Sequence, residues 1–139
     1  MNQPVVSRYQ DLETFRLAQN LAVKIHTLPL RRSHGEQGGQ ASALRRIARA
    51  AAEHIVAAAD RPLPRPRVVR DLVWAQGACD EARVHLDLLR LTGALAESHY
   101  RTLHDGYMRL SRMLALLVMA TQARGQAALW ATLVQTGIP

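Results

Sequence analysis

Residues 68–91, VVRDLVWAQGACDEARVHLDLLRL, carry the pattern that decides the fold. Small or apolar residues recur along this stretch at alternating steps of four and three. They are Val68, Leu72, Ala75, Cys79, Ala82, Leu86 and Leu89. This heptad spacing puts one apolar seam on one side of a long helix, as in helices that pack antiparallel in a bundle. The stretch therefore predicts a helix over about residues 67–91 whose seam faces other helices.

Three further stretches show apolar residues at helical spacing. The helices that they predict cover about residues 11–28, 42–60 and 97–123. Ser42 is the expected N-cap of the second helix, and Gly125 is the expected stop of the last. We expect a short amphipathic segment, AALWATLV at 127–134, to add a separate helical tail. The pattern predicts an all-α fold, an up-down antiparallel four-helix bundle with a short C-terminal helical tail.

The chain of 139 residues is of the size of one domain. We expect a single bundle domain over residues 1–139, with an N-terminal arm at 1–8 and a C-terminal tail at 126–139.

Positive charge is concentrated in the middle of the chain, although the whole sequence carries a formal net charge of +7. Residues 31–70 contain nine arginines and three acidic residues, a net charge of +6, and the rest of the chain has a net charge of only +1. The nine, called the arginine set below, are Arg31, Arg32, Arg45, Arg46, Arg49, Arg61, Arg65, Arg67 and Arg70. Such a concentration of charge attracts polyanions.

The second helix places three of these arginines together, because burial of its alanine-rich side leaves Arg45, Arg46 and Arg49 on the exposed arc. Guanidinium groups bind phosphates by charge and bidentate hydrogen bonds. No aromatic residues interleave the set, so we expect contact with the nucleic acid backbone and little sequence preference. The alternatives are a solvated face that keeps the protein soluble, or arginines that pair with acids of a neighbouring subunit.

The helix at 67–91 carries a second apolar stripe nearly opposite its heptad seam. The residues of this stripe are Val73, Trp74, Gly77, Val84, Leu88 and Leu91. A helix that is apolar on two sides needs two packing partners. We expect a second copy of the chain to cover the stripe, which makes it an oligomer interface. The alternative is that the segment at 127–134 folds back over it.

Three stretches resemble a known bacterial family of four-helix-bundle proteins. They are YQDLETFRLAQNLA at 9–22, LRRIARAAAEHIV at 44–56 and WAQGACDEARVHL at 74–86. The family comprises proteins encoded in intervening sequences of large-subunit ribosomal RNA genes and accessory variability factors of diversity-generating retroelements. The resemblance runs from about Tyr9 to Gln122. It implies a cytosolic, non-enzymatic protein that assembles as a ring of bundles, commonly five, with a basic surface that touches nucleic acid. In the retroelement branch it also implies contact with a reverse transcriptase.

The second helix departs from the family pattern. The family has a proline and then Asn-Ile-Ala-Glu-Gly where this chain has Ala52 and then His54-Ile55-Val56-Ala57-Ala58, and Ala43 replaces a glutamine. The arginine pair Arg45-Arg46 is retained. We expect the bundle to tolerate these changes, whereas any role of the missing Asn and Glu does not carry over.

The sequence shows no pattern for catalysis or for a metal. A di-iron bundle needs Glu-x-x-His sets, but Glu81 and His85 are four residues apart. A Gly-x-Ser-x-Gly motif and a Gly-rich phosphate loop with lysine are both absent from the sequence. Cys79 lies on the heptad seam, where we expect a small core residue. We therefore expect a protein that is not an enzyme and uses neither a metal nor another cofactor.

The sequence also indicates the cellular compartment of the protein. It shows no signal peptide and no apolar run of about 20 residues, and its single cysteine cannot form an internal disulfide. We expect a cytoplasmic protein that does not bind membranes. Two functions remain open: binding of nucleic acid through the arginine set, or a protein-interaction scaffold that recruits a protein partner through the apolar stripe.

Overall fold

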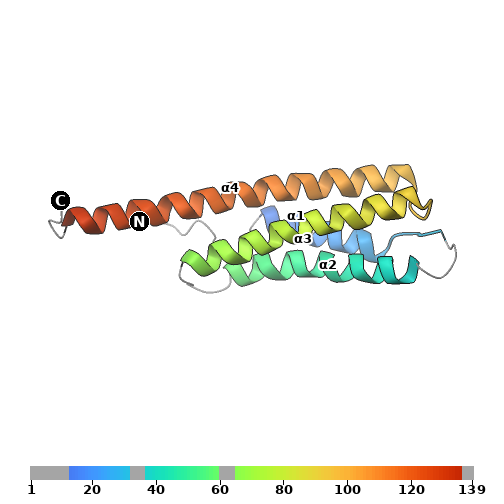
Figure 1. Cartoon of the computed structure of the whole chain (residues 1–139), viewed down its shortest axis with the longest axis horizontal. Helices are drawn as coiled ribbons and strands as arrows, with labels where there is room; N and C mark the ends of the chain where they lie inside the picture. Colours follow the sequence, from blue (N-terminus) through green and yellow to red (C-terminus); the bar gives the residue numbers. More distant parts are fainter. Residues whose placement is uncertain (1–12, 32–36, 60–64, 136–139) are drawn as a thin grey trace.

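The computed structural model describes residues 13–31, 37–59 and 65–135, with side chains over 13–31, 39–59 and 66–124. It contains four helices, α1 (Glu13–His26), α2 (Gln37–Ala59), α3 (Arg65–Leu91) and α4 (Glu97–Gln135). Each helix packs against the next in sequence and α4 also packs against α1, while the described residues bring neither α1 to α3 nor α2 to α4 (Figure 1). No strand occurs within these ranges. The predicted all-α four-helix bundle is confirmed.

The core consists of the residues that the heptads place inward. Six of the seven seam positions of α3 are buried, from Leu72 to Leu89, and only Val68 is partly exposed. On α2 the buried side is rich in alanine, which lets the helix backbones approach closely. The buried residues of that helix are Ala41, Leu44, Ile47, Ala48, Ala51, Ile55 and Ala58. In α4 Leu103, Tyr107, Leu110 and Leu114 complete the core.

Close packing of α1 against α4 depends on Gly106. A Cβ atom at this position would lie 2.5 Å from Cδ2 of Leu21, which is itself buried. The glycine therefore lets the two helices approach at the point where the leucine side chain enters the core.

The turn between α3 and α4 is held by a helix cap that needs glycine. Gly93 has a φ of 78°, a left-handed conformation that other residues adopt only at a cost. Its N–H donates to the carbonyl of Arg90 at 3.0 Å, and the N–H of Ala94 donates to the carbonyl of Leu89 at 2.9 Å. These are the two hydrogen bonds of a Schellman motif. The chain therefore reverses here in a defined geometry.

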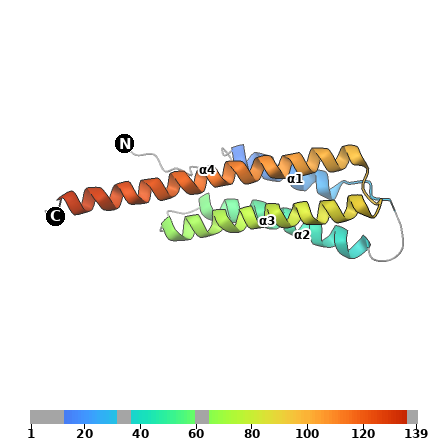
Figure 2. The same cartoon turned by 45° about the horizontal axis from the view of Figure 1, so that its top comes forward.

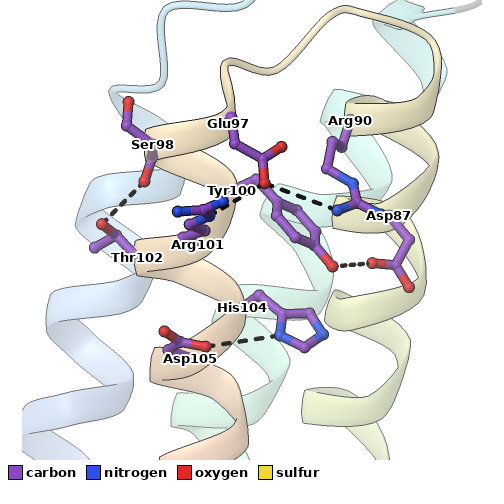
Figure 3. A network of polar contacts seen from close by, with 9 residues as sticks. All are labelled: Asp87, Arg90, Glu97, Ser98, Tyr100, Arg101, Thr102, His104 and Asp105. Carbon is purple, nitrogen blue, oxygen red and sulfur yellow. Dashed lines mark hydrogen bonds and ion pairs between the residues drawn. The ribbon is translucent and has the colours of Figure 1, made fainter.

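Side chains of both helices fasten the same end of the bundle (Figure 3). The Tyr100 hydroxyl donates to Oδ1 of Asp87 at 2.5 Å, and the Arg90 guanidinium lies over the Tyr100 ring, 4.2 Å from its centroid. Glu97 accepts from Arg101 at 3.2 Å and lies 3.9 Å from Arg90. The hydrogen bond to Asp87 raises the pKa of Tyr100. These contacts hold α3 and α4 in register near the turn.

The second helix begins earlier than the sequence predicts. It starts at Gln37, and Ser42 lies exposed inside the helix and is not its N-cap. Glycines at 38 and 39 disfavour this first turn by about 1 kcal/mol each. Two contacts favour it: Ala41 is buried, and Gln40 Oε1 lies 3.3 Å from Nδ1 of His85 on α3. Tertiary packing thus lets the helix begin before the N-cap that the sequence predicts.

The last helix does not stop at Gly125, and the predicted separate tail is wrong. It runs as one helix of 39 residues, 12 more than the 27 of α3. A single glycine costs a helix about 1 kcal/mol but does not end it, and the neighbouring Ala, Gln, Arg and Leu are good helix formers. Both views show the end of α4 running past the other helices (Figure 2). The backbone at 127–134 therefore does not fold back over α3.

None of the described helices has both the length and the apolar character needed to cross a membrane.

Candidate nucleic-acid interface

The exposed side of α2 carries three arginines. Arg45, Arg46 and Arg49 are all exposed, as predicted from the buried alanine-rich side of the same helix. One acid, Glu53, shares this exposed side. Because alanine side chains are short, the arginines are the long side chains on this part of α2.

The rest of the arginine set extends this charge along the bundle without forming one compact cluster. The N–H of Arg31 donates to the carbonyl of Ala94 at 2.9 Å, which places Arg31 at the α3–α4 turn. Arg70 lies 21 residues before the end of α3, about 30 Å away at 1.5 Å per residue. Arg67 lies one turn further along. The exposed arginines therefore span the length of the bundle.

Three predicted members cannot be placed. Arg32 and Arg61 lie outside the described residues, and the side chain of Arg65 does as well.

Several arginines outside the arginine set form ion pairs with carboxylates. Arg83 pairs with Asp80 at 3.5 Å, Arg90 and Arg101 pair with Glu97, and Arg109 pairs with Glu13 at 3.2 Å. By contrast, six exposed members have no carboxylate within ion-pairing distance among the residues whose side chains are described. These members are Arg31, Arg45, Arg46, Arg49, Arg67 and Arg70. Lys24 and Arg112 share this state, so it is not unique to the set. The positive charge of these six arginines is therefore not balanced by an ion pair among the residues whose side chains are described.

The start of α3 places positive charge where a helix least favours it. The first turn of α3 has no acidic residue and includes Arg65 and Arg67. A helix N-terminus carries a partial positive charge, so each nearby cation costs about 0.3–1 kcal/mol. These arginines are therefore not explained by the stability of their own helix.

The apolar stripe of α3 is exposed over its whole length. The exposed fraction of its large side chains runs from 40% at Leu88 to 73% at Leu91, and Gly77 is exposed as well. Nothing within the described residues covers it, and the course of α4 removes the fold-back alternative. The stripe is thus an apolar surface of α3 without an intramolecular partner.

One contact was missed from the sequence. The guanidinium of Arg70 lies over the Trp74 ring, 4.9 Å from its centroid, and the His54 ring meets the same tryptophan edge-on with centroids 5.4 Å apart. His54 Nδ1 also lies 4.0 Å from Oδ1 of Asp71, which is buried. An aromatic residue does therefore stand beside the arginine set. The signal in the sequence was the spacing of Arg70 and Trp74, one helical turn apart.

The side chains of Cys79 and Tyr107 lie in the core. Cys79 is buried and unpaired, and burial, followed by the charge of Asp80, raises its pKa to about 12. Burial also raises the pKa of Tyr107, whose hydroxyl is buried and has no hydrogen-bond partner among the described residues. Within the described part of the chain, no three His, Cys, Asp or Glu side chains come together as metal ligands.

The fold and this surface define a class: an all-α four-helix-bundle protein with exposed arginines on α2 and α3 and an exposed apolar stripe on α3. A family model of the 23S rRNA-intervening sequence protein matches residues 10–116, which is more than half of the chain. The chain belongs to the 23S rRNA-intervening sequence protein family. No curated protein matches it.

Proposed function

We propose that this protein binds the phosphate backbone of nucleic acid through the arginine set and performs no reaction. The observation that carries the proposal is that Arg45, Arg46 and Arg49 share the exposed side of α2 and have no carboxylate within ion-pairing distance among the residues whose side chains are described. Arg83, Arg101 and Arg109, by contrast, each lie within ion-pairing distance of a carboxylate. Unmatched guanidinium groups retain their full capacity for charge-assisted, bidentate hydrogen bonds to phosphate.

The layout of the charge suits an extended ligand. The arginines cover about 30 Å along the bundle, which corresponds to about nine nucleotides of one strand at 3.4 Å each. Contacts of this kind hold the backbone and give little discrimination among sequences. They also make binding fall steeply as salt is added.

The test is a native gel shift with duplex DNA and duplex RNA at low salt, using the full chain and a triple charge reversal, Arg45→Glu, Arg46→Glu and Arg49→Glu. The matched control is Arg101→Glu, Arg109→Glu and Arg112→Glu on α4, which changes the net charge equally at three other exposed sites. We expect the α2 variant to lose the shift and the control to keep most of it.

Circular dichroism checks that both variants remain helical. A wild-type protein that ignores both nucleic acids at low salt overturns the proposal, and so does a control variant that loses binding as completely as the α2 variant.

The apolar stripe supports association of the protein with itself. We propose that the C-terminal part of the stripe, with Val84, Leu88 and Leu91, packs against a second copy, and that the assembly is a closed ring of about five, as the family resemblance implies. The exposed fractions of these three side chains, 40% to 73%, support this proposal, since burial of such surface stabilises an oligomer. Leu88→Asp should lower the mass measured by sedimentation, and an unchanged mass contradicts it.

A second candidate function rests on the same stripe. A protein-interaction scaffold, for example an accessory subunit of a reverse transcriptase, would use the stripe for a different protein and the arginines only for solubility. It predicts a complex that survives high salt and is lost in Val84→Asp or Leu88→Asp, whereas nucleic acid binding predicts a complex lost in salt. We place either function in the cytoplasm.

A further inference from the structure

The exposure of Trp74 is explained neither by core packing nor by contacts with a phosphate backbone. Its side chain is 51% exposed, although tryptophan gains much from burial. Arg70 covers part of the ring from one turn before it, and His54 reaches the ring from α2. The ring is thus oriented by two neighbours while much of its surface stays open to solvent.

The Trp74 side chain borders a hollow between α2 and α3. This hollow has a volume of about 400 Å³, and its lining includes Trp74, His54, Ala50, Gly77 and Glu81. A Cβ at Gly77 would meet nothing within 4 Å, so the hollow is open at the glycine. Arg70 is not among the lining residues, and its guanidinium lies 4.9 Å from the centroid of the Trp74 ring.

Resting on the function proposed above, we propose that this hollow binds one unpaired nucleobase, stacked on Trp74, of a strand whose phosphates are held by the arginine set. A base has a flat aromatic face, and stacking on tryptophan is the usual way in which proteins hold single-stranded nucleic acid. Arg67, Arg70 and Trp74 follow at helical spacings of three and four, so two cations lie on the same side of α3 as the ring.

The chemistry of the hollow favours a base over an apolar protein side chain. Its walls include an imidazole and a carboxylate, His54 and Glu81, which can exchange hydrogen bonds with the polar edge of a base. An apolar side chain of a protein partner would bury these groups without satisfying them. The C-terminal part of the apolar stripe, with Val84, Leu88 and Leu91, does not line the hollow, is exposed and stays available to a protein partner.

The base must be unpaired, because the faces of paired bases are covered by their neighbours in the duplex and only their edges are accessible. This requirement distinguishes base binding from backbone binding. Arginine contacts serve single strands and duplexes alike, whereas Trp74 can contribute only to the binding of single strands.

The experiment compares a 12-nucleotide single-stranded RNA with its own duplex, by fluorescence anisotropy at fixed salt. The full chain carries Trp130→Phe, which leaves Trp74 as its only tryptophan because the sequence has two. We expect the single strand to quench the Trp74 emission. We expect Trp74→Ala to weaken single-strand binding by about 5- to 150-fold, the range for loss of one stacked base, and to change duplex binding by less than about threefold.

Two variants serve as controls. Trp74→Phe keeps an aromatic face and should restore most of the single-strand affinity. Leu116→Ala removes an exposed apolar side chain on α4, 66% exposed, and should change neither affinity.

Three outcomes overturn the proposal. If Trp74→Ala leaves the ratio of single-strand to duplex affinity unchanged while the α2 charge reversal abolishes both, backbone binding stands and the base site fails. If the Trp74 emission responds to protein concentration and not to RNA, the hollow is a contact between copies of the chain. If neither RNA binds at low salt, the proposed function fails and the base site with it.

Discussion

The dependence of binding on salt measures how many arginines contact phosphate. Each phosphate contact contributes a slope of about −0.9 to a plot of log K against log salt for a duplex. The described part of the chain has six exposed arginines of the set, so a subunit that uses all six has a slope of about −5.4. Between 50 and 200 mM salt, its affinity falls by about 2,000-fold.

Neutralising Arg45, Arg46 and Arg49 together to glutamine should halve this slope, to about −2.7, because three of six contacts are removed. The affinity of that variant then falls by only about 40-fold over the same salt range. Glutamine keeps a long polar side chain and good helix propensity, so the fold is not the variable.

The assay is anisotropy of a labelled duplex at several NaCl concentrations. The control neutralises Arg83, Arg101 and Arg109, which are paired with carboxylates, and its slope should stay near that of the wild type. The reasoning is refuted if the α2 variant keeps the wild-type slope, or if the control loses as much slope as the α2 variant.

Three further predictions concern the fold itself. Gly93→Ala should lower the free energy of unfolding by about 1–2 kcal/mol because its φ of 78° is left-handed, and Gly93→Asn should lower it by less; urea titration followed by circular dichroism checks both. Gly106→Ala should lower it by up to about 2 kcal/mol, since overpacking against Leu21 outweighs better helix propensity, whereas Gly39→Ala, with nothing within 4 Å, should not lower it. Burial raises the pKa of the Cys79 thiol from its ordinary value of 9.0 to about 12, so the unfolded chain loses this proton first and stability should fall by about 1.4 kcal/mol per pH unit above about pH 9; Cys79→Ala should remove that slope in urea titrations up to about pH 10.

The bundle is predictable because its signal is long and repeated. The seam of α3 recurs over seven positions, and a register of that length leaves few alternatives to a helix packed on one side. The two errors fall at the start of α2 and at the end of α4, where a local capping signal competes with packing or with good helix formers. An N-cap serine contributes about 1 kcal/mol, and a glycine inside a helix costs about 1 kcal/mol. At the start of α2, burial of Ala41 and the Gln40–His85 contact outweigh the capping preference of Ser42.

The candidate site is predictable only in part, for a physical reason. Exposure of Arg45, Arg46 and Arg49 follows from the spacing of the buried residues on one helix. Whether an arginine is paired depends on acids brought in from other helices, as Glu13 of α1 is for Arg109 of α4, and one helix's periodicity says nothing of that.

The hollow beside Trp74 is likewise formed by two helices. Ala50 of α2 and Gly77 of α3 line it together only because α2 packs on α3. Both residues are small. In the sequence such residues indicate weak packing, whereas in the structure they leave space beside the Trp74 ring.

The start of α3 provides the sharpest separation between folding and binding. Arg67 lies in the first turn of a helix whose N-terminus is already positive, without an acid in that turn, and it is exposed. Arg67→Glu should therefore raise the free energy of unfolding by about 0.6–2 kcal/mol, twice the usual contribution of one charge at a helix end, while it weakens duplex binding. If Arg67 serves the fold, Arg67→Glu lowers both the free energy of unfolding in urea titration and the duplex affinity in anisotropy. A rise in the free energy of unfolding with a fall in affinity shows that the cation serves binding. A loss of both contradicts the argument.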